Sequence, residues 1–197
     1  FDVIYENKNR YQVRIPHCGN LINRETEYAV LKMIHDENFV YFDKKTGVAI
    51  KEWINGKNPK FSWYRGYKYL NVLFNKIKQL HEIPVKNKKL FTKTSFDQYN
   101  EHLFHLRFDY QNKYLRLIDT YKEDKFVISH TDINAENMIV NKRGSVFLID
   151  FEWAALAPDY WDYANFIREE GIRYTLKLAS NNGHCYLPKR ELIAEAK

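Results

Sequence analysis

The sequence predicts an α+β fold in which a small β-rich lobe is followed by a larger helical lobe. Short strand-like runs separated by polar turns fill residues 1–54, whereas apolar residues recur at helical spacing through much of residues 61–197. Asn55-Gly-Lys-Asn-Pro59 combines turn formers with a proline where the strand pattern ends, so residues 55–60 are the expected linker. The 197 residues, 45% of them hydrophobic, suffice to bury a substantial core.

Two hairpins and one helix are expected in the small lobe. The hairpins pair residues 1–5 with 11–15, and residues 39–42 with 48–53. Gly47 lies in the second turn, where a glycine supplies the positive φ that such turns often require. Between the hairpins, Asn23 can cap a helix, because the apolar positions after it recur at helical spacing.

The helical lobe is expected to contain three helices and a third hairpin. The predicted helices span about residues 70–80, 96–121 and 163–170. The hairpin pairs residues 138–140 with 146–149 around a turn that contains Gly144.

One segment carries most of the chemical information, His130-Thr-Asp-Ile-Asn-Ala-Glu-Asn137, and after the third hairpin comes Asp150-Phe-Glu152. Phosphoryl transfer needs a carboxylate beside the attacking hydroxyl and oxygen ligands for the Mg²⁺ ions on the triphosphate. Asp132 fits the first role, while Asn137 and Asp150 offer the hard oxygen atoms that Mg²⁺ prefers. A single Asp or Asn beside a strand more often caps a turn. Here the fixed spacing of His, Asp and Asn, followed by a hairpin that ends in Asp-Phe, favours the catalytic interpretation.

The residues after Asp150 make a family resemblance specific. Glu152 stands where protein kinases usually have Gly, and Asp159-Tyr-Trp-Asp162 follows in place of a long activation segment. This layout resembles the choline/ethanolamine kinases of the bacterial type, within the aminoglycoside phosphotransferase and protein-kinase-like superfamily. The resemblance implies a protein-kinase-like fold of two lobes.

The resemblance also implies roles for the residues of this segment. Asp132 would be the catalytic base and would contact the acceptor hydroxyl, while Asn137 and Asp150 would bind the Mg²⁺ that accompanies ATP. Asp162 would brace the catalytic loop through hydrogen bonds. His130 is expected to pin the loop and not to act as a base.

In the small lobe, Tyr11-Gln-Val-Arg14 resembles the strand that carries the phosphate-contacting cation, so Arg14 is the expected cation. Glu25 is its expected partner, with Glu27 as a competitor. The adenine of ATP is expected at backbone groups of three hinge residues, Glu52, Trp53 and Ile54. The nucleotide loop of the family lies at about the point where this chain begins, so we expect part of the amino-terminal phosphate clamp to be missing.

The acceptor pocket is expected to hold an amino alcohol, choline or ethanolamine. Aromatic faces beside a carboxylate bind a quaternary ammonium, and the resemblance places Glu169 and Tyr174 in such a pocket, just after the last predicted helix. The Trp-rich segment that completes the pocket in the family does not appear before Lys197, so we expect a missing or a shortened carboxy-terminal part. An aminoglycoside, a sugar or another amino alcohol remains an alternative acceptor. A non-catalytic nucleotide-binding module is the alternative of a different class.

Composition argues against two other classes of partner. The net charge of +6 comes from scattered lysines, many of them beside asparagine, so no nucleic acid is expected. No apolar run approaches the roughly 20 residues that a membrane-spanning helix needs, and a cytoplasmic protein is expected. Cys18 and Cys185 match no metal-ligand spacing and are expected to be reduced.

Overall fold

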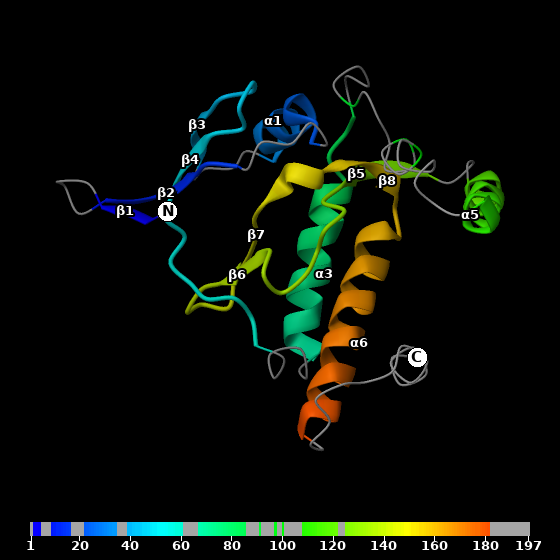
Figure 1. Cartoon of the computed structure of the whole chain (residues 1–197). Coiled ribbons are helices and arrows are strands. Elements are labelled where there is room, and N and C mark those ends of the chain that lie inside the picture. The colour runs from blue at the N-terminus through cyan, green and yellow to red at the C-terminus, as the bar shows by residue number, and fades with distance from the viewer. Residues whose placement is uncertain are drawn as a thin grey trace.

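The structure is a computed structural model. It describes residues 2–4, 9–16, 22–34, 39–60, 67–85, 91, 97, 100, 108–121 and 125–181. The chain combines antiparallel strands with helices, as the α+β prediction requires (Figure 1).

The small lobe contains a four-stranded antiparallel sheet with the strand order β1-β2-β4-β3. Its strands are β1 (Asp2–Ile4), β2 (Arg10–Arg14), β3 (Phe39–Phe42) and β4 (Ala49–Glu52). Both predicted hairpins are therefore confirmed. Helix α1 (Arg24–Met33) follows β2, and the side chain of Asn23 caps it by accepting a hydrogen bond from the N–H of Thr26 at 3.1 Å.

The helical lobe is built on α3 (Tyr67–His81) and α6 (Trp161–Asn181), which run side by side (Figure 1). Phe74 of α3 packs edge-on against Tyr163 and Phe166 of α6, with ring centroids 5.4 and 6.2 Å apart. Helix α5 (Phe108–Tyr121) corresponds to the carboxy-terminal part of the helix predicted over residues 96–121. Of the predicted residues before Phe108, only 97 and 100 are described, and both are helical.

Two short β-ladders flank the segments that contain the candidate catalytic and metal-binding residues. The predicted third hairpin is confirmed as β6 (Met138–Val140) paired with β7 (Val146–Leu148). A second ladder, which we did not predict, pairs β5 (Phe126–Ser129) with β8 (Ala155–Pro158). It brings the residues just before His130 beside those just after the 3₁₀ turn η3 (Phe151–Trp153).

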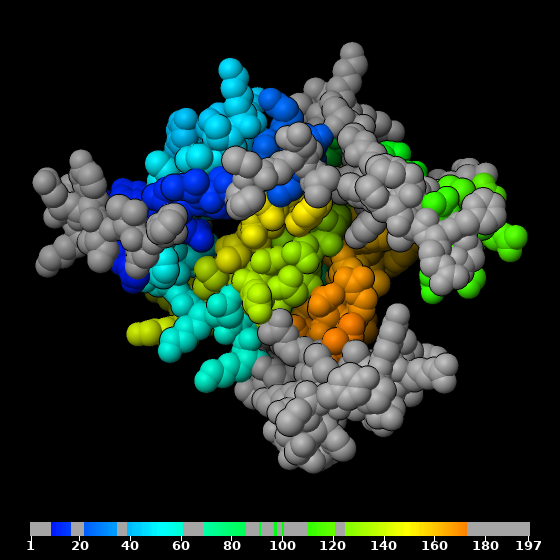
Figure 2. Space-filling model, viewed as in Figure 1, coloured from blue at the N-terminus to red at the C-terminus, as the bar shows by residue number. Residues whose placement is uncertain are grey.

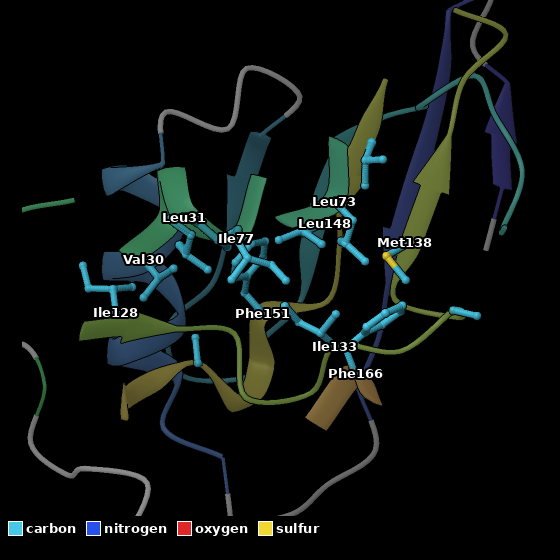
Figure 3. Close-up of a cluster of buried hydrophobic side chains, with 14 of the residues drawn as sticks. Val30, Leu31, Leu73, Ile77, Ile128, Ile133, Met138, Leu148, Phe151 and Phe166 are labelled. Carbon is cyan, nitrogen blue, oxygen red and sulfur yellow. The ribbon is translucent and has the colours of Figure 1, made fainter. Parts of the chain in front are cut away.

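One hydrophobic cluster runs through both lobes (Figure 3). Val30 and Leu31 of α1 belong to the same cluster as Leu73 and Ile77 of α3, and all four are at most 2% exposed. Phe151 of η3 lies in this cluster too, which agrees with the packing of α1 on η3. The segments that carry the candidate catalytic residues are thus anchored in the core, which fixes their backbone.

The last helix is longer than predicted. We expected it to end at residue 170, but α6 continues to Asn181. A single glycine, Gly171, costs a helix only about 1 kcal/mol, and the helix formers around Leu176 carry the helix past it. Within the part of the chain that the structure describes, no helix combines the length and the apolar character needed to cross a membrane.

Candidate active site

The candidate catalytic loop, residues 130–137, connects β5 to β6 and places Asp132 beside Asn137. It is called the catalytic loop below. The Asn137 side-chain amide donates to Asp132 Oδ2 at 2.8 Å and to the Asp132 carbonyl at 2.9 Å. The amide of Asn134 donates to Asp132 Oδ1 at 3.2 Å. Both carboxylate oxygens of Asp132 are therefore oriented by neutral donors, and neither forms an ion pair with another residue that the structure describes. The Asn137 amide nitrogen is committed to Asp132, so its oxygen is the atom that can serve a metal ion.

Asp162 supports the start of this loop from α6. Its fully buried carboxylate accepts hydrogen bonds from the backbone N–H of His130 at 3.0 Å and of Thr131 at 2.8 Å. The expected bracing role of Asp162 is thus confirmed as a hydrogen-bonding pattern. His81, at the end of α3, places Nε2 2.9 Å from Asp162 Oδ2. We did not predict this partner, because the two residues lie 81 positions apart and no local pattern links them.

His130 holds the loop against the segment that carries the candidate metal ligand Asp150. Its Nε2 lies 2.9 Å from the carbonyl oxygen of Ile149, and its ring lies 4.5 Å from the ring of Phe151. His130 is fully buried. These contacts agree with the expectation that it pins the loop.

Thr131 and Asp150 adopt left-handed backbone conformations, with φ of 64° and 63°. Such conformations are uncommon for residues other than glycine, and most uncommon for a β-branched residue such as Thr131. The conformation of Thr131 is held from both sides, because its hydroxyl donates to the Trp153 carbonyl at 2.6 Å and its own carbonyl accepts from the Asn165 amide. Backbone strain of this kind is common at functional sites. Sequence reasoning missed both Thr131 and Asn165.

Arg14 connects the small lobe to Asp150. Its guanidinium lies 2.6 Å from Glu27 and 3.1 Å from Asp150 Oδ1, and it also donates to the carbonyl of Gly47 at 3.1 Å. The expected partner Glu25 is wrong, because Glu25 is exposed and pairs with Lys44 at 3.0 Å. The reason is helical geometry: positions 25 and 27 differ by about 200° around the α1 axis, so when one faces solvent the other is buried.

A second arginine, Arg24, connects these ion pairs to Glu152. Arg24 lies 2.8 Å from Glu27 and 3.5 Å from Glu152. Burial and the nearby charge of Asp150 raise the pKa of Glu152, while Arg14 and Arg24 oppose the rise. We call these five side chains the lobe-bridging cluster: Arg14, Arg24, Glu27, Asp150 and Glu152.

The predicted hinge begins where β4 ends. The N–H of Trp53 donates to the carbonyl of Arg10 at 2.9 Å, so it is unavailable to adenine. The guanidinium of Arg10 also stacks 4.2 Å from the centre of the Trp53 ring. Tyr11 opposes Glu52 in a non-hydrogen-bonded position of the ladder, so the backbone groups of Glu52 face away from β2. An adenine contact at the Trp53 N–H is therefore wrong, whereas the contacts expected at backbone groups of Glu52 and Ile54 stay predictions.

The expected acceptor residues lie within α6 and not after a helix. Glu169 is seven residues after Asp162 and four after Asn165, which puts it on the side of α6 that supports the catalytic loop. Its carboxylate pairs with the neighbouring Arg168 at 2.8 Å. Position 174 is about 140° away from position 169 around a helix axis. The side chain of Tyr174 lies outside the described residues, so its predicted role stays a prediction.

The side chains of Asn137 and Asp150 fit a magnesium site in which ATP phosphates and water supply the other ligands. No group of three or more His, Cys, Asp or Glu side chains that could hold a metal occurs among the residues that the structure describes. Mg²⁺ in phosphoryl-transfer sites is usually bound by one or two side-chain oxygens together with substrate phosphates and water. Asn137 and Asp150 supply such a donor pair, and the Asp150 side chain is 41% exposed.

The site and the two-lobed architecture define a protein of the kinase-like fold. The family follows from its sequence: the model of the choline/ethanolamine kinase family matches residues 4–186, and the chain belongs to this family. The family resemblance stated above is thereby confirmed.

Two curated relatives are themselves uncharacterized proteins. The MG356 homolog of Mycoplasma pneumoniae is 32% identical over 167 residues, which are 82% of this chain and 57% of that protein. A Metamycoplasma hominis protein is 29% identical over 153 residues, which are 77% of this chain and 27% of that protein. The chain therefore spans a little over half of the first relative and about a quarter of the second.

Solved structures share the fold at low sequence identity. An ethanolamine kinase of Plasmodium vivax matches with a TM-score of 0.71 and 18% identity, over 98% of this chain and 65% of that chain. Amicoumacin kinase in complex with AMP-PNP, Ca²⁺ and Ami matches with a TM-score of 0.64 and 11% identity, over 99% and 66% of the two chains. The gentamicin complex of APH(2″)-IIa gives 0.59 and 14%, over 96% and 84%. These likenesses confirm the fold class.

Proposed function

We propose that this chain carries the catalytic core of an ATP- and Mg²⁺-dependent kinase that phosphorylates the hydroxyl of choline or ethanolamine. The observation that supports it most is the pairing of Asp132 with Asn137. The side-chain nitrogen of Asn137, the candidate metal ligand, lies 2.8 Å from Oδ2 of Asp132, the candidate base. Both residues lie on a loop whose start is fixed by the buried carboxylate of Asp162. Membership of the choline/ethanolamine kinase family supplies the class of acceptor.

Asp132 would orient the acceptor hydroxyl and receive its proton. The alcohol oxygen would form a bond to the γ-phosphorus as the bond from that phosphorus to the ADP oxygen breaks, and the proton would move to the Asp132 carboxylate. Neutral amides of Asn134 and Asn137 orient this carboxylate without cancelling its charge. The group can therefore remain a base while its geometry is fixed.

Asn137 and Asp150 would hold Mg²⁺, which when bound neutralises charge on the triphosphate. Arg14 would contact phosphate from the small lobe, and its pairing with buried Glu27 fixes its guanidinium. Backbone groups of Glu52 and Ile54 would bind adenine.

Glu169 would supply the counter-charge for the amino alcohol. It lies on the same side of α6 as Asp162 and Asn165, both of which contact the catalytic loop. A cation near this carboxylate would compete with Arg168, whose guanidinium pairs with it. Tyr174, about 140° from Glu169 around the axis of α6, is proposed as an aromatic wall of the pocket.

A coupled assay for ADP release tests the proposal. Wild-type protein is incubated with Mg-ATP and, separately, with choline, ethanolamine and kanamycin. We expect turnover with choline or ethanolamine, and Asp132→Asn should lower it by about a hundredfold or more while ATP binding is retained. Turnover with kanamycin alone would assign the aminoglycoside alternative. Mg-ATP binding without turnover on any acceptor would support the non-catalytic module.

A further inference from the structure

The linker does not cross freely between the lobes, because it is bonded to the catalytic hairpin. Lys57 donates its N–H to the Val140 carbonyl at 3.0 Å, and Val140 donates its N–H to the Lys57 carbonyl at 2.8 Å. In Figure 1 the trace after β4 passes beside the β6–β7 hairpin. In Figure 2 the cyan linker atoms lie against the yellow-green atoms of the catalytic segment.

Gly56 shows how closely the two backbones approach. A Cβ at this position would lie 2.4 Å from Ile139 Cγ2 and 2.6 Å from the Val140 carbonyl oxygen. Both separations are far below contact distance, so a side chain at position 56 would force the linker away from β6. The bridge at Lys57 fixes where the next side chain, that of Asn58, enters the catalytic lobe.

The side-chain amide of Asn58 donates hydrogen bonds to three carbonyl oxygens of the catalytic loop and β6. The distances from Nδ2 are 2.9 Å to Glu136, 2.9 Å to Met138 and 3.3 Å to Ala135. Glu136 and Met138 are the two residues that flank Asn137. The amide of Asn58 therefore holds the backbone on both sides of the candidate metal ligand.

The remaining backbone groups of Asn137 are also bonded. Its carbonyl accepts from the N–H of Ile149 at 3.0 Å, and its N–H faces Asn134 O and Oδ1 at 3.2 and 3.1 Å. Asn58 thus completes a set of contacts around Asn137, and it is the member of this set that comes from the linker.

We propose that Asn58 is a positioning residue: it holds Asn137 in the orientation that binds Mg²⁺, and so couples the linker to the metal site. The inference rests on the proposed function, in which Asn137 is a metal ligand. Residues that orient a metal ligand commonly change metal affinity by about 10–100-fold when they are replaced. Asn58 itself is exposed, so water can satisfy the released carbonyls, and the loss falls on position more than on folding.

Two substitutions at this position should differ in a definite order. Asn58→Ala removes the donor, and the three carbonyls are left to water. Asn58→Asp keeps the shape but places carboxylate oxygens against carbonyl oxygens, which repel them. The positioning role therefore predicts a larger defect for Asn58→Asp than for Asn58→Ala. Asn112→Ala, at an exposed position of α5, is the matched control.

The test is equilibrium binding of AMP-PNP during a Mg²⁺ titration, with turnover measured in parallel. We expect Asn58→Ala to need about tenfold more Mg²⁺ for half-maximal AMP-PNP binding, and Asn58→Asp to need still more. Affinity for AMP-PNP at saturating Mg²⁺ and the thermal midpoint should stay close to wild type for Asn58→Ala. The control should match wild type throughout.

Three outcomes would overturn the inference. If both Asn58 variants keep the wild-type Mg²⁺ requirement, the positioning role fails and the proposed function stands. If they only lower the thermal midpoint, Asn58 is a structural clamp and no more. If the wild-type protein shows no Mg²⁺-dependent AMP-PNP binding at all, the proposed function fails, and this inference fails with it.

Discussion

Replacing Gly47 by alanine should disrupt the lobe-bridging cluster by displacing Arg24. Gly47 has φ of +75°, and a Cβ there would lie 2.4 Å from Arg24 Nε and 2.7 Å from Arg24 Cζ. We expect the displaced guanidinium of Arg24 to lengthen its pairs with Glu27 and Glu152, which measure 2.8 and 3.5 Å. The substitution should therefore strain the backbone and also displace a largely buried guanidinium.

Gly144→Ala supplies the matched comparison. Gly144 has φ of +82°, and a Cβ there would meet no atom within 4 Å. Both variants incur the left-handed cost of about 1–2 kcal/mol, and both lower the entropy of the unfolded chain by a similar amount. The difference between them isolates the displaced arginine, and loss of one hydrogen bond to a charged group is worth about 1.5–3 kcal/mol.

Thermal unfolding of the two variants measures this difference. For a chain of this size, 1 kcal/mol shifts the midpoint by about 2–4 °C, so Gly47→Ala should melt about 3–12 °C below Gly144→Ala. Equal midpoints would refute the reasoning, because they would mean that Arg24 relocates at no cost. The reasoning would also be refuted if Gly144→Ala lowered the unfolding midpoint and Gly47→Ala did not.

Three further predictions concern the site directly. Asp162→Asn should lower stability by about 2–4 kcal/mol, because the buried carboxylate accepts from two backbone N–H groups and faces His81; urea unfolding measures it, and an unchanged midpoint would contradict the bracing role. Asp150→Ala should abolish the response of ATP affinity to Mg²⁺, since it removes a proposed metal ligand; calorimetric titration with and without Mg²⁺ decides. Glu169→Gln should raise the KM for choline about fivefold, because the counter-charge of the cation is lost. Arg168→Ala should lower the KM, because it frees the carboxylate of Glu169 from its ion pair. If the KM changed in the same direction in both variants, the result would count against the cation pocket.

Local sequence patterns predicted the elements whose partners are close in the chain. All three hairpins were found because each turn carries its own signal, such as Gly47 or Gly144. The β5–β8 ladder was missed because its strands are separated by the whole catalytic segment, and no local turn joins them. The run Phe126–Ser129 was available as a strand signal, but its partner Ala155–Pro158 contains a proline and small residues that favour strands poorly.

The candidate site shows the same division. Spacing along the chain was enough to mark Asp132, Asn137 and Asp150 as chemical residues, because phosphoryl transfer uses them at fixed offsets. Spacing could not choose between Glu25 and Glu27 as the partner of Arg14, since that choice depends on which side of α1 faces the sheet. It also could not reveal Asn58 or His81, whose partners are 77 or more residues away.

The charge balance of the lobe-bridging cluster explains why a metal ion and a nucleotide would suit it. Two guanidinium groups, of Arg14 and Arg24, face the three carboxylates of Glu27, Asp150 and Glu152. The surplus negative charge falls nearest Asp150 and Glu152. Burial raises the pKa of Glu152, and the nearby charge of Asp150 adds to the rise. A divalent cation beside Asp150 would reverse that surplus and make the cluster attractive to a triphosphate. Because Arg14 contacts both Glu27 of α1 and Asp150 of the helical lobe, the same charge would act on the junction between the lobes, which is where the proposed function places ATP.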